Sequence, residues 1–397
     1  MPSQGFLRSV LIAAVCLFSG ILTAQTPTPS PTPADEFTIV ALPDTQFYSS
    51  LHPEIFAAQT NWIANHVQDQ NIQLVVGLGD IVDGGGVLTQ WQNADAAVRL
   101  LDGHVPYMMA MGNHDYDKND PASRTASSKN FNTYFGPARY ATASWYKGNF
   151  PAGSNENFYG VITVNGKSYL IVVLEFAARD TSLAWADGLI KANPDKDVII
   201  VTHMFTYADS TRISQCDENS AASFGVGQDN NGDDMWWKLV RKYSNVHLVL
   251  SGHVVEGDGT GRRTDLGING NLVNQILSDY QSDPNGGNGY LRIMRISPSL
   301  NRVSVTTYSP YLDSFLTDDH NQFTVPYRNP GVSTAAGTVS GIVKNALTCA
   351  VAPGVTVTAN GVSAVTDSNG NFTIVANARK SLAITATKTG WLSDART

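Results

Sequence analysis

The stretch Leu74-Val-Val-Gly-Leu-Gly-Asp-Ile-Val-Asp83 joins a run of aliphatic residues, two of them β-branched, to a turn that carries two carboxylates. The run Leu74–Leu78 is apolar at successive positions, which predicts a strand buried on both faces, and Gly79 and Asp80 follow it directly. The ends of such strands are where an α/β sheet gathers its ligand-binding side chains. The competing interpretation of Asp80 is a polar cap after a buried strand.

The same arrangement recurs along the chain. Apolar runs precede four further polar clusters, at Phe37–Leu42, Val105–Met111, Val198–Val201 and Val246–Leu250. The clusters that follow these runs are Asp44-Thr45-Gln46, Gly112-Asn113-His114-Asp115, Thr202-His203 and Ser251-Gly252-His253. Carboxylate, amide and imidazole groups are metal ligands, so this repetition predicts one metal site at the ends of several strands.

The bulk composition narrows the classes of function. The chain has 397 residues, of which 42% are hydrophobic and 15% charged, with a formal net charge of −8. This length allows more than one domain and a sizeable core. The negative charge argues against nucleic acid or an anionic membrane surface as the main partner. A small anionic substrate would need local positive charge, for which a bound metal is the simplest source.

The N-terminus has the layout of a secretory signal peptide. Arg8 precedes the apolar stretch Val10–Leu22, and Thr23-Ala24 offers a small-residue cleavage site near Gln25. The stretch is short for a membrane span, and no later apolar run approaches that length. We therefore expect a signal peptide over residues 1–25 and a secreted protein, periplasmic or extracellular, with no transmembrane segment.

The next segments predict a tether and then an enzyme core. Residues 26–35 are rich in Pro and Thr, which is typical of an extended linker. From residue 36 to 330, strand-like and helix-like segments alternate, as in an α/β or α+β core. Helices are expected at Pro53–Asp69, Val87–Leu101 and Thr181–Asn193, and a hairpin at Tyr159–Leu174. Substrate choice is expected to lie in two long polar loops, Tyr116–Pro151 and Thr206–Asp234.

The C-terminal part has a different composition. Residues 331–337 form a predicted linker, and residues 338–397 hold short Val/Thr/Ile runs separated by turn residues such as Pro353-Gly354 and Asn360-Gly361. This order of turns resembles the carboxypeptidase-regulatory-like, transthyretin-type β-sandwich. The resemblance implies a small all-β domain, which we expect to stabilise the protein or to contact a cell surface or another protein. Cys216 and Cys349 lie in different predicted domains, and a disulfide between them is one option.

Taken together, the five polar clusters resemble the calcineurin-like metallophosphoesterase superfamily, which includes the purple acid phosphatases. The resemblance implies an α+β fold, a four-layer α/β/β/α sandwich, with the metal centre at the strand ends. It also implies divalent metal ions, two in number and drawn from Mn, Fe, Zn or Mg, and a small phosphoester substrate. A metal-bound water or hydroxide would attack phosphorus, and His114 would protonate the leaving alcohol.

The resemblance also implies roles for single residues. Asp80 would bridge two metals, and Asn113, His203 and His253 would complete the site of the second metal. Asp44 and Gln46 would belong to the first metal site. Asp115 would act in catalysis by holding the His114 imidazole in one tautomer.

Two positions depart from the family pattern. Gln46 stands where the family usually has His, and Val255 stands where the last His is expected. Fewer nitrogen donors would weaken the first metal site and favour oxygen-preferring ions such as Mn²⁺ or Mg²⁺. Glu256 is one candidate replacement, although on a continuing strand it would face away from the side of residue 255. Asp279-Tyr280-Gln281, after the strand Leu272–Leu277, is another.

Other functions compete with a phosphoesterase. The lost histidines favour a binding or adhesion protein on the same scaffold with a degraded metal site, while the intact Asn113-His114-Asp115 run opposes it. A serine hydrolase is disfavoured because the sequence has no Gly-x-Ser-x-Gly elbow. Arg262 and Arg263 follow His253 in a Gly-rich stretch, where they would either contact substrate phosphate or belong to a solvated loop.

Overall fold

A computed structural model describes residues 33–117, 127–224, 229–328, 336–345, 348–377, 384–391 and 394–396. The predicted signal peptide, most of the first linker and most of the linker at 331–337 lie outside these residues. Within the described ranges, no helix combines the length and the apolar character needed to cross a membrane.

Two seven-stranded mixed sheets form the main body of the chain. The first has the order β13–β12–β11–β1–β2–β3, with β14 also paired to β12, and the second has the order β4–β5–β6–β7–β8–β10–β9. The strands of the first sheet are β1 (Phe37–Leu42), β2 (Ile72–Gly77), β3 (Tyr107–Met109), β11 (Leu291–Ser297), β12 (Arg302–Ser309), β13 (Ser314–Leu316) and β14 (Phe323–Pro326). Those of the second are β4 (Tyr146–Phe150), β5 (Asn157–Val164), β6 (Lys167–Leu174), β7 (Asp197–Thr202), β8 (Val246–Ser251), β9 (Thr260–Leu266) and β10 (Leu272–Ser278).

The two sheets pack face to face through aliphatic side chains. One buried cluster includes Ile39 and Val76 from the first sheet and Ile171, Ile199 and Leu248 from the second. Residues at alternate positions of the same strands point outward into two other apolar clusters. This two-sided burial explains why the strands are continuous apolar runs rather than alternating ones.

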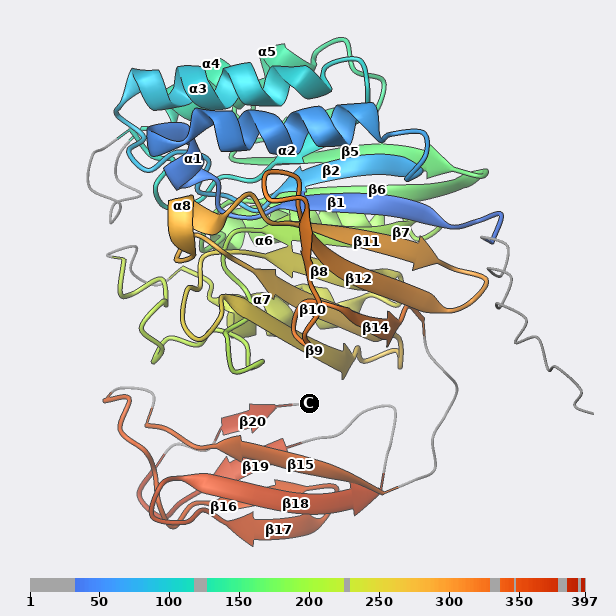
Figure 1. Ribbon diagram of the computed structural model, residues 1–397. Coiled ribbons are helices and arrows are strands. Elements are labelled where there is room, and N and C mark those ends of the chain that lie inside the picture. The colour runs from blue at the N-terminus through green and yellow to red at the C-terminus, as the bar shows by residue number, and fades with distance from the viewer. Residues whose placement is uncertain are drawn as a thin grey trace, which may run out of the picture. The chain divides into compact units, whose positions relative to one another are not determined.

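Helices cover the two outer faces, which gives the four-layer α/β/β/α arrangement that the family resemblance implies (Figure 1). The helices α1 (Gln46–Leu51), α2 (Pro53–Asn65), α3 (Leu88–Val98), α4 (Lys129–Phe135) and α5 (Pro137–Tyr140), with the 3-10 turn η1 (Arg99–Leu101), accompany the first sheet. The helices α6 (Asp180–Lys191) and α7 (Gly232–Lys238), with η2 (Val240–Lys242), accompany the second. A short helix, α8 (Pro284–Gly287), follows β10.

One predicted loop is wrong. We expected Tyr116–Pro151 to be a long polar loop, but its described part contains α4, α5 and β4. Phe131, Phe135 and Tyr140 are buried there, in the cluster that also holds Trp91. These aromatic residues are separated by polar ones, so the average polarity of the segment concealed a face that packs against α3.

The C-terminal strands form two further sheets. The first pairs β15 (Ala336–Ile342) with β18 (Asn371–Asn377), and the second has the order β17–β16–β19–β20. The strands of the second are β16 (Thr356–Ala359), β17 (Val362–Val365), β19 (Ile384–Thr387) and β20 (Asp394–Arg396). Val355, Val357 and Ile374 belong to a separate buried cluster. Cys349 in this part forms a disulfide with Cys216.

Topology brings the predicted ligands to one end of the sheets. Strands β1, β2 and β3 are parallel, and β6, β7, β8 and β10 are parallel in the second sheet. Each polar cluster follows the C-terminal end of one of these strands.

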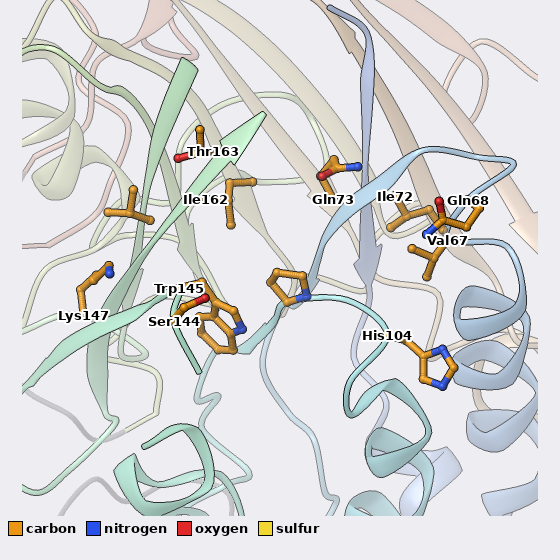
Figure 2. A pocket seen from close by; sticks show the side chains of 12 residues that line it. Val67, Gln68, Ile72, Gln73, His104, Ser144, Trp145, Lys147, Ile162 and Thr163 are labelled. Carbon is orange, nitrogen blue, oxygen red and sulfur yellow. The ribbon is translucent and has the colours of Figure 1, made fainter. Parts of the chain in front are cut away.

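A groove of about 480 Å³ lies away from these strand ends, lined by Ile72 at the start of β2 and by His104, Trp145 and Lys147 (Figure 2). None of the predicted site residues lines this groove.

Candidate metal centre

Two buried histidines form the centre of the site. His203 directly follows β7, and its Nδ1 contacts the carbonyl oxygen of Leu78 at 2.9 Å. His253 follows β8, and its Nε2 contacts the carbonyl oxygen of Asn219 at 3.3 Å. A carbonyl can only accept, so each of these nitrogens carries the proton. The other nitrogens, Nε2 of His203 and Nδ1 of His253, lie 3.1 Å apart and are left to bind a ligand.

Two oxygen donors join the imidazoles at the same point. Oδ2 of Asp80 and Oδ1 of Asn113 each lie 3.1 Å from Nε2 of His203. The ligand atoms offered by Asp80, His203 and His253 all lie within 4.8 Å of one another. We call Asp80, Asn113, His203 and His253 the imidazole set. Two nitrogens with fixed tautomers and two oxygens, all buried, fit a divalent cation of borderline softness.

The backbone around the imidazole set is strained. Asp80 and His253 both have positive φ, at 45° and 77°. Gly79 has φ of +104°, and a Cβ atom there would lie 2.4 Å from Nδ1 of His203. At Gly112 a Cβ atom would lie 2.1 Å from Oδ1 of Asp80. Strain of this kind persists where the surrounding structure requires it, and here it lets ligands from different strands approach closely.

The charges of the set act on one another. Burial alone would raise the pKa of Asp80, but the charges of His203 and His114 outweigh it and hold this pKa well below its usual range. Burial opposes the charged form of His203, yet the adjacent Asp80 raises the pKa of this ring above its ordinary value. Burial and the charge of His203 lower the pKa of His253 to about 3, so this ring is neutral at physiological pH and can offer a lone pair.

A second group of oxygens adjoins the imidazole set. Asp44 accepts a hydrogen bond from the backbone N–H of His253 at 3.1 Å through Oδ2, which also lies 4.0 Å from Nε2 of His203. Gln46, at the start of α1, donates from Nε2 to Oε1 of Gln281. Asp279, directly after β10, is buried as well. Burial and the charges of Asp279 and Asp80 raise the pKa of Asp44 well above its usual value.

His114 lies at the edge of the site with 19% of its side chain exposed. Its Nε2 is 4.0 Å from Oδ2 of Asp80, and its backbone N–H donates to Oδ1 of the same residue at 2.8 Å. Its Nδ1 contacts the carbonyl oxygen of Asp83 at 2.7 Å. One ring nitrogen is therefore fixed by the backbone, and the other faces the site.

The hydrogen bonds of Asp115 differ from those that the family resemblance implies for it. We expected this carboxylate to hold the His114 imidazole, but the Asp83 carbonyl does so instead. Asp115 accepts hydrogen bonds from the backbone N–H groups of Gly112 at 2.8 Å and Val82 at 3.1 Å. The tight turn after β3 directs its carboxylate back toward the chain, so Asp115 ties two ligand-bearing turns together. Burial and the charge of Asp80 raise its pKa to about 7.

Other candidate residues lie outside the imidazole set. Glu256 accepts a hydrogen bond from Nδ2 of Asn219 at 2.6 Å. Arg262 and Arg263 belong to β9 rather than to a loop. Arg262 donates to the carbonyl oxygen of Asp319 at 2.8 Å, and Arg263 pairs with Asp265. These contacts direct all three side chains to other partners.

Two aromatic residues that the sequence analysis did not select line the imidazoles. The Phe176 ring lies 5.8 Å from the ring of His203 and 5.0 Å from that of His253, and the Phe224 ring lies 4.8 Å from that of His253. Phe176 follows the end of β6, and its position after an apolar strand is the sequence signal that could have identified it. Apolar walls of this kind lower the local dielectric constant around a cation.

Residues 37–257 match the sequence model of the calcineurin-like phosphoesterases, which is more than half of the 397 residues. The chain belongs to the calcineurin-like phosphoesterase family. It is similar to the uncharacterized protein YvnB of Bacillus subtilis (strain 168), with 32% identity over 292 residues, 71% of this chain and 20% of that protein. A probable inactive purple acid phosphatase 24 of Arabidopsis thaliana is 31% identical over 86 residues, 20% of this chain and 14% of that protein. The chain thus spans at most about a fifth of the length of these curated relatives.

Solved structures show distant similarity. The purple acid phosphatase PPD1 from yellow lupin (Lupinus luteus) seeds aligns with a TM-score of 0.46 and 14% identity, over 75% of this chain and 55% of the lupin chain. GAP50, the anchor in the inner membrane complex of Plasmodium, aligns with a TM-score of 0.42 and 13% identity, over 75% of this chain and 90% of that chain.

Proposed function

We propose that this protein hydrolyses small phosphoesters in a reaction that depends on divalent cations. The observation that carries the proposal is the convergence of Oδ2 of Asp80, Oδ1 of Asn113, Nε2 of His203 and Nδ1 of His253 on one buried point. A bound cation would supply positive charge to phosphoryl oxygens and lower the pKa of a bound water. Membership of the calcineurin-like phosphoesterase family supports the same reaction class.

The residues of this chain would divide the work as follows. The imidazole set would hold the cation, and Oδ1 of Asp80 accepts a hydrogen bond from the backbone N–H of His114, which fixes His114 beside it. Nε2 of His114 is the ring atom that faces the site, and it would give its proton to the departing alkoxide. The carbonyl of Asp83 keeps the ring in this orientation by accepting from Nδ1.

A binding protein with little turnover is the second candidate. The observation that favours it is the replacement of two family histidines, by Gln46 and by Val255, of which Val255 is 36% exposed and offers no donor. Two relatives with partial matches are named probable inactive purple acid phosphatases. The fixed orientation of His114 beside Asp80 has no evident use in such a protein, so we place this candidate second.

We further propose that the protein is exported and that residues 338–397 form a carboxypeptidase-regulatory-like β-sandwich. The Cys216–Cys349 disulfide supports export, because such bonds persist mainly in oxidising compartments. Two small sheets around a separate apolar cluster support the sandwich. N-terminal sequencing of the mature protein tests the first point, since export with processing should place the new terminus near Gln25.

Metal analysis together with turnover of a phosphoester panel tests the hydrolase. His114→Ala should lower the turnover number by about 10²- to 10⁴-fold and leave the cation bound. His253→Ala should remove the cation. His104→Ala is the matched control, because this ring is exposed and lies outside the imidazole set. Turnover that survives in His114→Ala would exclude the proposed proton donor, and bound cation without turnover on any ester would favour the binding protein.

A further inference from the structure

One segment between β7 and α7 contacts the imidazole set without contributing a ligand to it. Residues 214–224, all within the described part of the chain, form turns rather than a helix or a strand, and we call them the Cys216 segment. The backbone carbonyl of Asn219 in this segment accepts from Nε2 of His253 at 3.3 Å. The ring of Phe224 lies 4.8 Å from the ring of His253. The Cys216 segment therefore orients one of the two imidazoles on which the proposed function depends.

Side-chain hydrogen bonds hold the Cys216 segment against neighbouring loops. Asn219 donates from Nδ2 to Glu256 at 2.6 Å, and the backbone N–H of Ala221 donates to Oδ1 of Asn231 at 2.8 Å. Turns lack the hydrogen-bond ladder of a sheet, so their positions depend on contacts of this kind and they open more easily than the core. Any further attachment of this segment should therefore affect the position of the Asn219 carbonyl.

The C-terminal part of the chain supplies a covalent attachment. Cys216 forms a disulfide with Cys349, which lies 133 residues further along the sequence. Cys349 belongs to the connection between β15 and β16. Oδ1 of the neighbouring Asp217 lies 3.6 Å from Nζ of Lys344, which precedes Cys349 in the same connection. Cys216 is only three residues from Asn219, so the disulfide restrains the backbone that carries the carbonyl partner of His253.

We propose that the Cys216–Cys349 disulfide is a positioning device for His253, so that reduction of this bond weakens cation binding at the imidazole set. The disulfide acts through the Cys216 segment, because the Asn219 carbonyl fixes both the tautomer and the orientation of the His253 ring. The proposal rests on the proposed function in that His253 is a cation ligand.

The disulfide is open to reductants in solution. Cys349 is exposed and Cys216 is half-buried, so a thiolate can attack the sulfur of Cys349 and release Cys216. A dithiol supplies two electrons and two protons in this exchange. The S–S bond breaks, Cys216 and Cys349 each become a thiol, and the dithiol closes into its own disulfide. The cation ligands are unchanged by this step, whereas the Cys216 segment loses its covalent restraint.

The role of the Asn219 carbonyl sets the expected size of the effect. Loss of an outer-shell partner of a metal ligand costs about 10- to 100-fold in affinity. Reduction loosens this partner and does not remove it, because the hydrogen bond between Ala221 and Asn231 remains. Opening the disulfide should therefore weaken cation binding by about 10-fold, the lower end of that range.

Cation titration of the metal-free full-length chain tests this inference. In calorimetry, the double variant Cys216→Ser/Cys349→Ser should bind Zn²⁺ about 10-fold more weakly than the wild type. Thr348→Ala is the matched control and should bind like the wild type, because Thr348 is exposed beside Cys349 and the disulfide remains.

Reduction of the wild type tests the same bond without a substitution. Mn²⁺ is the probe here, because free thiolates prefer softer ions such as Zn²⁺. The affinity for Mn²⁺ should fall after treatment with dithiothreitol, which is removed before the titration, and should return on reoxidation. The double variant should respond to neither treatment.

Two further readouts separate positioning from a general loss of stability. Nε2–H of His253 donates to the Asn219 carbonyl, so its proton signal in nuclear magnetic resonance should exchange with solvent faster in the double variant than in the wild type. Turnover of the double variant should fall at limiting cation and recover at saturating cation, because its ligands are intact. Thermal unfolding of the metal-free double variant shows that it is folded at the temperature of the titration.

The outcomes separate the two proposals. If the double variant and the reduced wild type bind cations as tightly as the oxidised wild type, while His253→Ala has lost them, the inference is overturned and the proposed function stands. If Thr348→Ala weakens binding as much as the double variant does, the effect does not come from the disulfide and the inference is again overturned. If His253→Ala binds cations as the wild type does, the proposed function is wrong and the inference fails with it.

Discussion

Asp115→Ala distinguishes a structural from a catalytic role for this carboxylate. Asp115 is buried and accepts from two buried backbone N–H groups, those of Gly112 and Val82. Removing it leaves both donors unsatisfied, at about 1–3 kcal/mol each, so the free energy of unfolding should fall by about 2–6 kcal/mol. Because Gly112 and Val82 belong to the turns that carry Asn113 and Asp80, cation affinity should fall as well.

Denaturant unfolding of the metal-free protein measures this loss. Asp83→Ala is the matched control: its carboxylate is in the same motif but is 41% exposed, and the carbonyl that orients His114 remains. The control should change stability by no more than about 0.5 kcal/mol. If Asp115→Ala kept wild-type stability and instead lowered turnover with a shifted pH profile, the role implied by the family resemblance would be right and our structural interpretation would be wrong.

Three further predictions concern the strained turn, the buried carboxylates and the disulfide. Gly79→Ala should destabilise the chain by about 1–3 kcal/mol and weaken cation binding, because its Cβ would meet His203. Gly103→Ala is the control and should affect stability alone, because Gly103 also has a positive φ, +78°, but no atom lies within 4 Å of its added Cβ. Equal cation affinities of the two variants in calorimetry would contradict this prediction. Burial raises the pKa of Asp279 to about 6, above the value of about 4 for an Asp in an unfolded chain, so the folded protein loses stability as pH rises from 4 through 6 and this carboxyl must ionise. The melting temperature of metal-free Asp279→Asn should therefore rise relative to that of the wild type between pH 4 and 7. A difference that stays constant over this pH range would refute this prediction. Cys216→Ser should lower the free energy of unfolding by about 2–5 kcal/mol and abolish any response of the melting curve to reductant, because it removes the disulfide to Cys349. A variant whose melting curve still responds to reductant would contradict this disulfide.

The strands and the polar residues at their ends could be predicted from the sequence because both depend on local patterns, whereas the four-layer fold and the roles of the imidazole set were implied by the family resemblance. Apolar runs such as Val246–Leu250 identify buried strands without help from tertiary structure, and a polar residue directly after such a run must lie at the end of the sheet. His203 and His253 follow their strands in this way. The hairpin at Tyr159–Leu174 is confirmed as β5 and β6 for the same reason, since its turn and its strand pattern agree.

What could not be predicted depends on where a turn directs its side chain. Nothing in the order His114-Asp115 shows that the carboxylate turns back to the backbone of Gly112 and Val82, or that a carbonyl from Asp83 replaces it. The sequence offered Glu256 and Asp279 as equal replacements for the missing ligand. The structure separates them, because Glu256 is held by Asn219 whereas Asp279 lies beside Asp44.

Anomalous diffraction from crystals of the full-length protein grown with Zn²⁺ or Mn²⁺ tests the central claim most directly. We expect an anomalous peak within coordination distance of Asp80, Asn113, His203 and His253, with Nε2 of His203 and Nδ1 of His253 as the nitrogen ligands. A metal bound elsewhere, with these four side chains in contact only with one another, would contradict it.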